Sequence, residues 1–236
     1  MIAKHKNIGI NEIYGILKRD YGYNRHPNSL YRVLKKNNYG GIIKKKTKKH
    51  IPKIYNTPLM FGEKMQLDVK YVPAVCCTNK EKYYQYTILD EATRERFIYP
   101  YTKRNAYNSV DFLKRAIKYF KYVPKVIQTD NGSEFCNINE NDIKEKNHIF
   151  DVFLKTNEII HKRIKIKTPS HNGKVERSHG NDNKRFYKNE KFNSIEDLII
   201  KMSIYLIRSN NIPNSSLGWL TPNEKRTILE NKTKTC

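Results

Sequence analysis

Three strand-like segments follow one another at short intervals, and they constrain the fold of this chain more than any other feature. They are MQLDVKYVPAV (residues 65–75), YYQYTILD (83–90) and RFIYPY (96–101), and all three are rich in β-branched or aromatic residues. Gaps this short leave room for turns but not for crossover helices. The sequence therefore predicts a meander of three antiparallel strands.

The residues after the meander alternate between predicted helices and strands. Apolar residues at helical spacing indicate a helix over 107–122, and the short apolar run KVIQT (125–129) is typical of a buried strand. A helix around 150–156, a strand over 159–166 and a polar helix over 172–189 follow. This order predicts an α/β fold in which helices pack on a sheet.

The first forty residues indicate two short helices joined by a turn. An apolar stripe from Ile10 to Leu17 marks the first helix, and Asn28 or Ser29 is expected to cap the second. The second helix is basic, with Arg32 and Lys35 among its cations. The pattern favours a helix-turn-helix-like DNA-binding segment as much as it favours a plain helical hairpin.

Changes in composition divide the chain into four parts. We predict the helix-turn-helix-like segment over 1–43, a basic linker over 44–54, the α/β domain over 55–228 and a tail over 229–236. The linker lacks apolar periodicity and is dense in lysine. Such a run is typical of a solvated tether that also suits a path along phosphates.

The charge balance points to a polyanionic partner. Lysine and arginine outnumber the acidic residues by 46 to 23, which gives a formal net charge of +23. Nucleic acid is the first partner that this charge suggests, and an anionic membrane surface is the second. The longest nearly apolar stretch, residues 198–207, is too short to span a bilayer, and the first residues do not read as an export signal. No membrane partner is therefore expected. Four cysteines without a Cys-x-x-Cys fit a reducing cytoplasm, where the chain is expected.

Three acidic residues occupy positions where a carboxylate is unusual. Asp68 lies inside a predicted strand among apolar residues, and Asp130 ends the strand KVIQT, just before an Asn-Gly turn. Glu176 lies in a predicted helix that is otherwise rich in cations. A carboxylate within a strand is costly to bury unless a cation or a metal faces it. If the two strands are neighbours, the three side chains converge on one spot.

Converging carboxylates would repel one another, so the set predicts a divalent metal site. Ligands that are all oxygen favour Mg²⁺ or Mn²⁺. Two such ions about 3.5–4 Å apart would activate a nucleophile and stabilise the leaving oxygen of a phosphodiester. Taken singly, Asp130 is also explained by a surface turn and Glu176 by a helix salt bridge.

Four sequence blocks together resemble the catalytic core of DDE-type transposases of bacterial insertion sequences, the retroviral-integrase-like group. They are QLDVKYVP, YYQYTILDEATR, VIQTDNGSEF and TPSHNGKVERSHGNDNKRFY, and the resemblance covers about residues 55–228. It implies an RNase H-like integrase core, with a mixed five-stranded sheet flanked by helices, that uses Mg²⁺ to cut DNA and join strands. Asp68, Asp130 and Glu176 match the three metal-binding catalytic acids of the group.

DNA contacts are predicted from the resemblance and from charge. Lys174 and Arg177 match basic positions beside the catalytic Glu of the group, and Asn172 belongs to the matching turn. The basic strip from His161 to Lys174 leads into the same helix and is interpreted as a DNA-contacting surface. The predicted DNA-binding residues are Lys174, Arg177, Asn172, Lys165, Lys167, Arg163, Lys184, Arg32 and Lys35.

The leading hypothesis is a Mg²⁺-dependent transposase of a bacterial insertion sequence. Its partners would be the terminal repeats of the element, target DNA and further copies of itself in a synaptic complex. A nuclease of the same fold is one alternative, and a truncated, inactive DNA-binding copy that competes with the full-length transposase is another. The interval of 45 residues between Asp130 and Glu176 is long for the group, which predicts a surface insertion at 136–148.

Two further kinds of residue stand near the predicted acids. Glu134 is either a supporting carboxylate of the site or a solvent-facing turn residue. His171 and His179 flank Glu176, and a surface or hydrogen-bonding role is favoured for them over metal ligation.

Overall fold

The computed structural model describes residues 9–37, 39, 56–137, 148–164 and 172–234. Within it the chain forms two compact units, Pro58–Ser209 and a second that joins Met1–Thr57 to Asn210–Cys236. The predicted linker 44–54 and most of the predicted insertion 136–148 lie outside the described residues. No helix in the described part is both long and apolar enough to cross a membrane.

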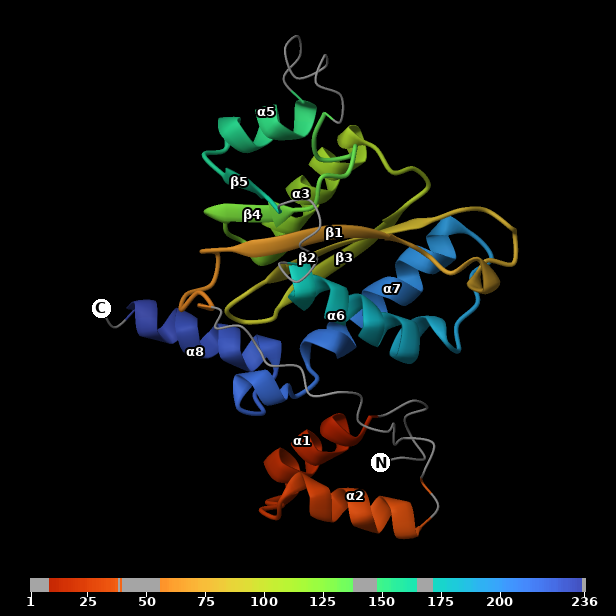
Figure 1. The fold of residues 1–236 in the computed structure, drawn as a ribbon, viewed down its shortest axis with the longest axis vertical. Coiled ribbons are helices and arrows are strands. Elements are labelled where there is room, and N and C mark those ends of the chain that lie inside the picture. Colours follow the sequence, from red (N-terminus) through yellow and green to blue (C-terminus); the bar gives the residue numbers. More distant parts are fainter. Residues whose placement is uncertain (1–8, 38, 40–55, 138–147, 165–171, 235–236) are drawn as a thin grey trace. The chain divides into compact units, whose positions relative to one another are not determined.

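The larger unit is built on one five-stranded sheet (Figure 1). Its strands are β1 (Met65–Tyr71), β2 (Tyr84–Asp90), β3 (Arg96–Tyr101), β4 (Val126–Thr129) and β5 (Ile160–Arg163), in the spatial order β3-β2-β1-β4-β5. The pairs β1–β2 and β2–β3 are antiparallel, which confirms the predicted meander. The pairs β1–β4 and β4–β5 are parallel, so the sheet is mixed.

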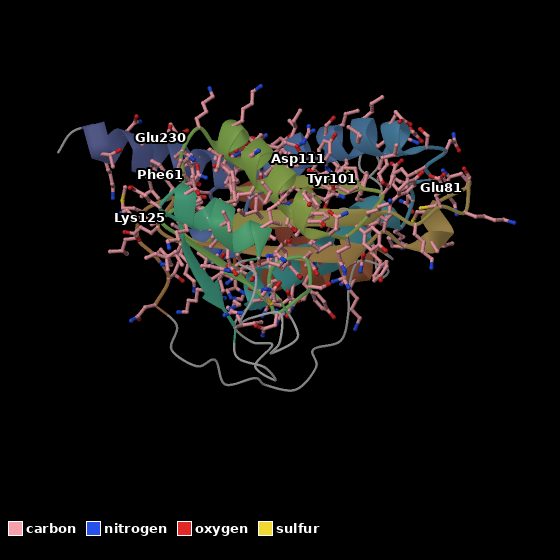
Figure 2. All side chains as sticks on the ribbon, turned by 90° about the horizontal axis from the view of Figure 1, so that it is seen from above. Phe61, Glu81, Tyr101, Asp111, Lys125 and Glu230 are labelled. Atoms are coloured by element: carbon pink, nitrogen blue, oxygen red, sulfur yellow. The ribbon has the colours of Figure 1, made fainter. Side chains whose placement is uncertain are left out.

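One face of the sheet is apolar and carries α3 (Ala106–Phe120) and α5 (Ile149–Thr156). Met65 and Leu67 point to this face from β1, because alternate residues of a strand point the same way. They pack with Phe112 and Leu113 of α3 in a core that is sealed from solvent. The Tyr101 hydroxyl donates to Asp111 Oδ2 at 2.6 Å and ties β3 to α3, as the neighbouring labels in Figure 2 show.

The opposite face of the sheet carries α6 (Gly173–Asp182), a π-helical turn (Asn183–Tyr187) and α7 (Ile195–Asn210). It is apolar where Ile98 of β3 packs with Leu198 and Met202 of α7, and mostly polar where β1 and β2 face α6, the part that is called the polar face below. A 3₁₀ turn, Ala74–Cys76, lies in the connection between β1 and β2. The residues of β1 and β2 that point to this face alternate with the core residues of the apolar face. They are Gln66, Asp68, Lys70, Gln85, Thr87 and the apolar Leu89.

A buried ion pair fixes α6 on the polar face. Arg96 Nη2 of β3 lies 2.7 Å from Asp182 Oδ1 at the end of α6, and both side chains are almost fully buried. Asp182 also accepts hydrogen bonds from Gln85 Nε2 at 2.8 Å and from the Tyr205 hydroxyl of α7 at 2.9 Å. Asp182 therefore connects α6 to the sheet and to α7 through three charged or polar partners.

The smaller unit contains α1 (Ile10–Tyr21), α2 (Pro27–Lys36), a 3₁₀ turn (Ser215–Leu217) and α8 (Pro222–Lys234). Ile13, Tyr14, Leu30 and Leu34 form its core, and Trp219 packs against them. The tilted rings of Tyr14 and Trp219 have centroids 4.6 Å apart. The segment after Asn210 therefore supplies part of the hydrophobic core on which the first two helices pack.

Two helices of the smaller unit, α8 and α2, are capped by side chains at their N-termini. The Thr221 hydroxyl accepts from Glu224 N at 3.1 Å and Glu224 Oε2 accepts from Thr221 N at 2.8 Å, which together form the reciprocal capping box of α8. The expected cap of α2 by Asn28 or Ser29 is wrong. That helix begins at Pro27, and His26 Nδ1 accepts from Asn28 N at 3.1 Å.

Removing the charge of Asp182 should destabilise the larger unit strongly. We expect Asp182→Ala to lower the free energy of unfolding by about 3–5 kcal/mol, because the Arg96 guanidinium stays buried without its countercharge. Arg96→Met combined with Asp182→Leu should recover most of this loss. Denaturant unfolding of the wild type, Asp182→Ala and the double variant checks both statements, and a double variant no more stable than Asp182→Ala would contradict a direct coupling.

Candidate active site

Asp68 lies in the middle of β1 on the polar face of the sheet, and its side chain is 19% exposed. Its Oδ1 accepts from the backbone N–H of Val69 at 2.9 Å. Its Oδ2 lies 3.4 Å from His179 Nδ1 on α6. The strand therefore presents this carboxylate to α6, as the sequence predicts for an acid that faces a site.

Asp130 follows β4 directly and lies beside the strand that carries Asp68. Gln66 of β1 pairs with Gln128 of β4 in parallel register, so Asp68 and Asp130 each stand two residues further on. Asp130 Oδ1 accepts from Gly132 N at 3.0 Å, and Asn131 Nδ2 donates to the carbonyl of Ile164 at 2.8 Å. The Asp-Asn-Gly turn thus anchors the end of β4 to the residue that follows β5.

Glu134 lies under this turn and is only 2% exposed, so its interpretation as a solvent-facing residue is wrong. A Cβ on Gly132 would come within 2.5 Å of the Glu134 carboxylate, which explains the glycine at that position. Glu134 Oε2 is buried without a hydrogen bond and lies 3.6 Å from Arg104 Nε. The site therefore contains a fourth carboxylate behind Asp130.

Glu176 projects from the first half of α6 and is exposed to solvent. His179, one turn later on the same helix, is buried and contacts Asp68. Its Nε2 has no hydrogen-bond partner among the described residues. Burial, more than any nearby charge, lowers the pKa of His179 to about 4, so the ring is neutral at physiological pH. His179 therefore lies in the interior beside Asp68, and His171 lies outside the described residues.

The electrostatics of Asp68 show that the four carboxylates act on one region. Burial, followed by the charges of Asp130, Glu176 and Glu134, raises the pKa of Asp68 to about 7, against the opposing hydrogen bond from Val69. Burial also raises the pKa of Glu134, to which the charge of Asp130 contributes. Negative charge at this spot is therefore incompletely compensated by the protein itself.

The donor set fits a hard divalent cation by its chemistry. All four acids offer oxygen ligands, which Mg²⁺ and Mn²⁺ prefer, and the uncompensated charge favours a cation. The four carboxylates do not surround a common point, because in the described part of the chain no three His, Cys, Asp or Glu side chains lie close enough together to hold a metal ion. The predicted ligands thus share one region, and their oxygens do not yet converge on one point.

The predicted DNA-binding residues fall into three groups. Arg163, Arg177 and Lys184 are exposed in the larger unit, and Arg32 and Lys35 are exposed in the smaller one. Lys165 and Lys167 lie outside the described residues. Their contact with DNA stays a prediction.

Asn172 and Lys174 form the third group, and both have partners inside the protein. Asn172 is 2% exposed and accepts from Gln128 Nε2 at 3.4 Å. Lys174 Nζ binds Glu91 Oε2, and burial lowers the pKa of Lys174 against the opposing effect of Glu91. Their surroundings therefore give these two residues a structural role in anchoring α6.

Two buried residues beside the site were not identified from the sequence. Gln66 accepts from Val175 N at 3.1 Å, and Glu91, in the turn after β2, is fully buried. Gln66 could have been identified from the sequence, because it stands two residues before Asp68 and must share its face of the strand. Glu91 could not have been identified, since an acid in a turn is ordinarily solvated.

Comparison with known proteins gives one family and several similar folds. Residues 60–169 match the family model described as integrase core domain. The chain is 34% identical over 233 residues to "Putative integrase ORF3" of Spiroplasma virus SpV1-C74, across 93% of this chain and 64% of that protein. The chain thus spans less than two thirds of the length of this relative.

Several solved viral integrase structures have a similar fold. The intasome of simian T-cell lymphotropic virus with PP2A regulatory subunit B56 gamma gives a TM-score of 0.58 at 17% identity, covering 86% of this chain and 67% of that one. The HTLV-2 integrase catalytic core domain with magnesium, in its trimeric form, gives 0.53 at 19% identity over 71% and 98%. The BIV integrase catalytic core domain gives 0.54 at 16% identity over 73% and 99%. These matches confirm the predicted RNase H-like core with a mixed five-stranded sheet.

The raised pKa of Asp68 predicts a pH-dependent cost in the metal-free protein. Between its unfolded pKa near 3.8 and its folded pKa of about 7, the folded state holds the extra proton, so stability falls as pH rises through this range. Asp68→Asn should therefore be more stable than the wild type by roughly 1–3 kcal/mol at pH 8, with the gain vanishing near pH 4. Denaturant unfolding in a chelator at both pH values tests this, and a difference independent of pH would contradict it.

Proposed function

We propose that the chain is a divalent-metal-dependent DNA strand transferase of a mobile element, since residues 60–169 match the family model described as integrase core domain. The observation that carries the proposal is that Asp130 and Glu176 lie near enough to Asp68 for their charges to raise the pKa of its carboxyl group. The finer proposal is a transposase of an insertion sequence that cuts at the ends of its element and joins them to target DNA.

Each acid would have a distinct part in holding the cation. Asp68 offers an oxygen from a rigid central strand, Asp130 offers one from the end of the neighbouring strand, and Glu176 offers one from α6. Mg²⁺ or Mn²⁺, as one or two bound ions, would lower the pKa of the attacking water or DNA hydroxyl and neutralise charge on the scissile phosphate. The exposed position of Glu176 leaves room for a DNA strand beside it.

Positive charge around the acids would hold the DNA backbone. Arg177 and Lys184 are exposed on and after α6, and Arg163 is exposed at the end of β5. Phosphate contacts of this kind fix the register of the DNA without reading its sequence. Sequence recognition of the element ends is proposed for the helix-turn-helix-like segment over 1–43, ahead of a catalytic domain over 55–228.

Several copies of the chain would act together in this proposal. One similar structure is an intasome, and the HTLV-2 integrase core exists in a trimeric and a dimeric form. Joining two element ends to one target needs two active sites, which a homo-oligomer supplies. We therefore propose a synaptic complex of several chains with terminal-repeat and target DNA.

The activity is tested with the purified chain, Mg²⁺ or Mn²⁺, and duplexes carrying the terminal repeats that flank its gene. We expect metal-dependent nicking at the repeat end, followed by joining to a second duplex. Glu176→Gln should lose at least a hundredfold in cutting while its affinity for the DNA changes by less than about threefold, because the lost carboxylate acts on the metal.

Two other outcomes of this experiment would contradict strand transfer. Retention of DNA without cutting by the wild type would point to a copy that only binds and competes. Cutting without preference for the repeat end, and without joining, would point to a nuclease of the same fold.

DNA binding should fall steeply with salt because phosphate neutralisation drives it. We expect Arg177→Ala and Lys184→Ala each to weaken binding to all sequences alike and to reduce the slope of log K against log salt by about 1. Lys118→Ala, an exposed cation on α3 of the apolar face, serves as the charge-matched control. Equal slopes for all three variants would contradict a DNA path along α6.

A further inference from the structure

A buried glutamine connects the strand of Asp68 to the helix of Glu176. Gln66 is 1% exposed and stands two residues before Asp68 on the same face of β1. Its Oε1 accepts from the backbone N–H of Val175 at 3.1 Å. Val175 immediately precedes Glu176 on α6, so this single bond spans the two elements that carry the acids.

Glu91 holds the other end of the same glutamine. Gln66 Nε2 donates to Glu91 Oε1 at 3.1 Å, and Glu91 is fully buried in the turn after β2. Lys64 Nζ lies 3.0 Å from Glu91 Oε1, and Lys174 Nζ of α6 binds Glu91 Oε2. Lys174 stands two residues before Glu176. The first turn of α6 is therefore fastened at two consecutive residues, once by a backbone amide and once by an ammonium.

These contacts matter more for the position of α6 than for the stability of the fold. A buried ion pair contributes little net stability compared with apolar packing, because desolvation offsets most of the Coulomb attraction. Its geometry is nevertheless demanding, since any displacement leaves a charge without its partner. Gln66 and Glu91 sit at the one end of α6 where a displacement of an ångström would alter the gap between Glu176 and Asp68.

We propose that Gln66 and Glu91 are positioning residues that hold the first turn of α6, and with it Glu176, beside the region of Asp68 in which a divalent cation would bind. The inference rests on the proposed function, because it takes Asp68 and Glu176 as ligands of one metal site. It gives Lys174 the task of fastening α6 to Glu91 in place of a contact with DNA. Partners that orient metal ligands typically change metal affinity about 10–100-fold when they are removed.

Metal binding to the DNA-free full-length chain tests this directly. Mn²⁺ affinity is measured by water-proton relaxation for the wild type, Gln66→Met and Glu91→Gln, with Glu176→Gln as the variant that loses a ligand. We expect the first two variants to bind Mn²⁺ about tenfold more weakly than the wild type at 25 °C. Circular dichroism at the same temperature checks that both variants are folded. Glu91→Gln keeps the shape of the side chain and carries the test if Gln66→Met does not fold.

Gln85→Met is the matched control. Gln85 is equally buried and also binds the α6 segment, but at its far end, through Asp182 at 2.8 Å and the Tyr187 hydroxyl. We expect this variant to lose stability and to keep Mn²⁺ affinity within about twofold. If Gln85→Met weakens Mn²⁺ binding as much as Gln66→Met does, general loosening of α6 explains the effect and the proposal is overturned.

Lys174→Met separates anchoring from DNA contact. The proposal expects it to weaken Mn²⁺ binding as Glu91→Gln does and to leave DNA affinity in the absence of metal unchanged within about threefold. A loss of DNA affinity with normal Mn²⁺ binding would overturn the anchoring role. Failure of the proposed function would look different, because the wild type and Glu176→Gln would then bind Mn²⁺ equally.

Discussion

The arrangement of the larger unit depends on how a polar helix is held on a polar sheet face. α6 has no apolar stripe to bury, and the residues facing it from β1 and β2 are mostly amides and charged groups. Hydrophobic burial therefore cannot fix its position, and directional bonds must do so. The Arg96–Asp182 pair fixes its carboxyl end, and the Gln66–Val175 bond fixes its amino end. The placement of Glu176 follows from both.

The two faces of the sheet consequently divide the tasks of the domain. The apolar face packs α3 and α5 over a sealed core, which supplies stability that varies little with pH or salt. The polar face holds the acids, where burial and mutual repulsion raise the pKa of Asp68 to about 7. Such repulsion is a cost to the metal-free fold, and a cation that binds all the acids would relieve it. The stable face thus supports a site that is itself unfavourable without its ion.

Much of this was predictable from local patterns. The strand-like segments predicted β1 to β5, and the convergence of two aspartates, one within a strand and one after another, required only that β1 and β4 be neighbours. The capping box at Thr221 was readable because its partners are three residues apart. The role of Glu91 was not readable, because its partners Gln66 and Lys174 are distant in the sequence. The same distance made Lys174 look like a free surface cation.

The contrast between Lys174 and Arg177 shows why charge alone misassigns residues in a basic chain. Both stand near Glu176, and positions three apart are neighbours on a helix surface, yet Lys174 binds the buried Glu91 and Arg177 is exposed to solvent. With an excess of 23 cations, most lysines need no internal partner, whereas a fully buried acid always needs one. A buried acid is therefore a better guide to internal ion pairs than a cation is, because the cations that bind it can be identified once it is found. In this chain Glu91 and Asp182 are two such acids, and both fasten α6 to the sheet.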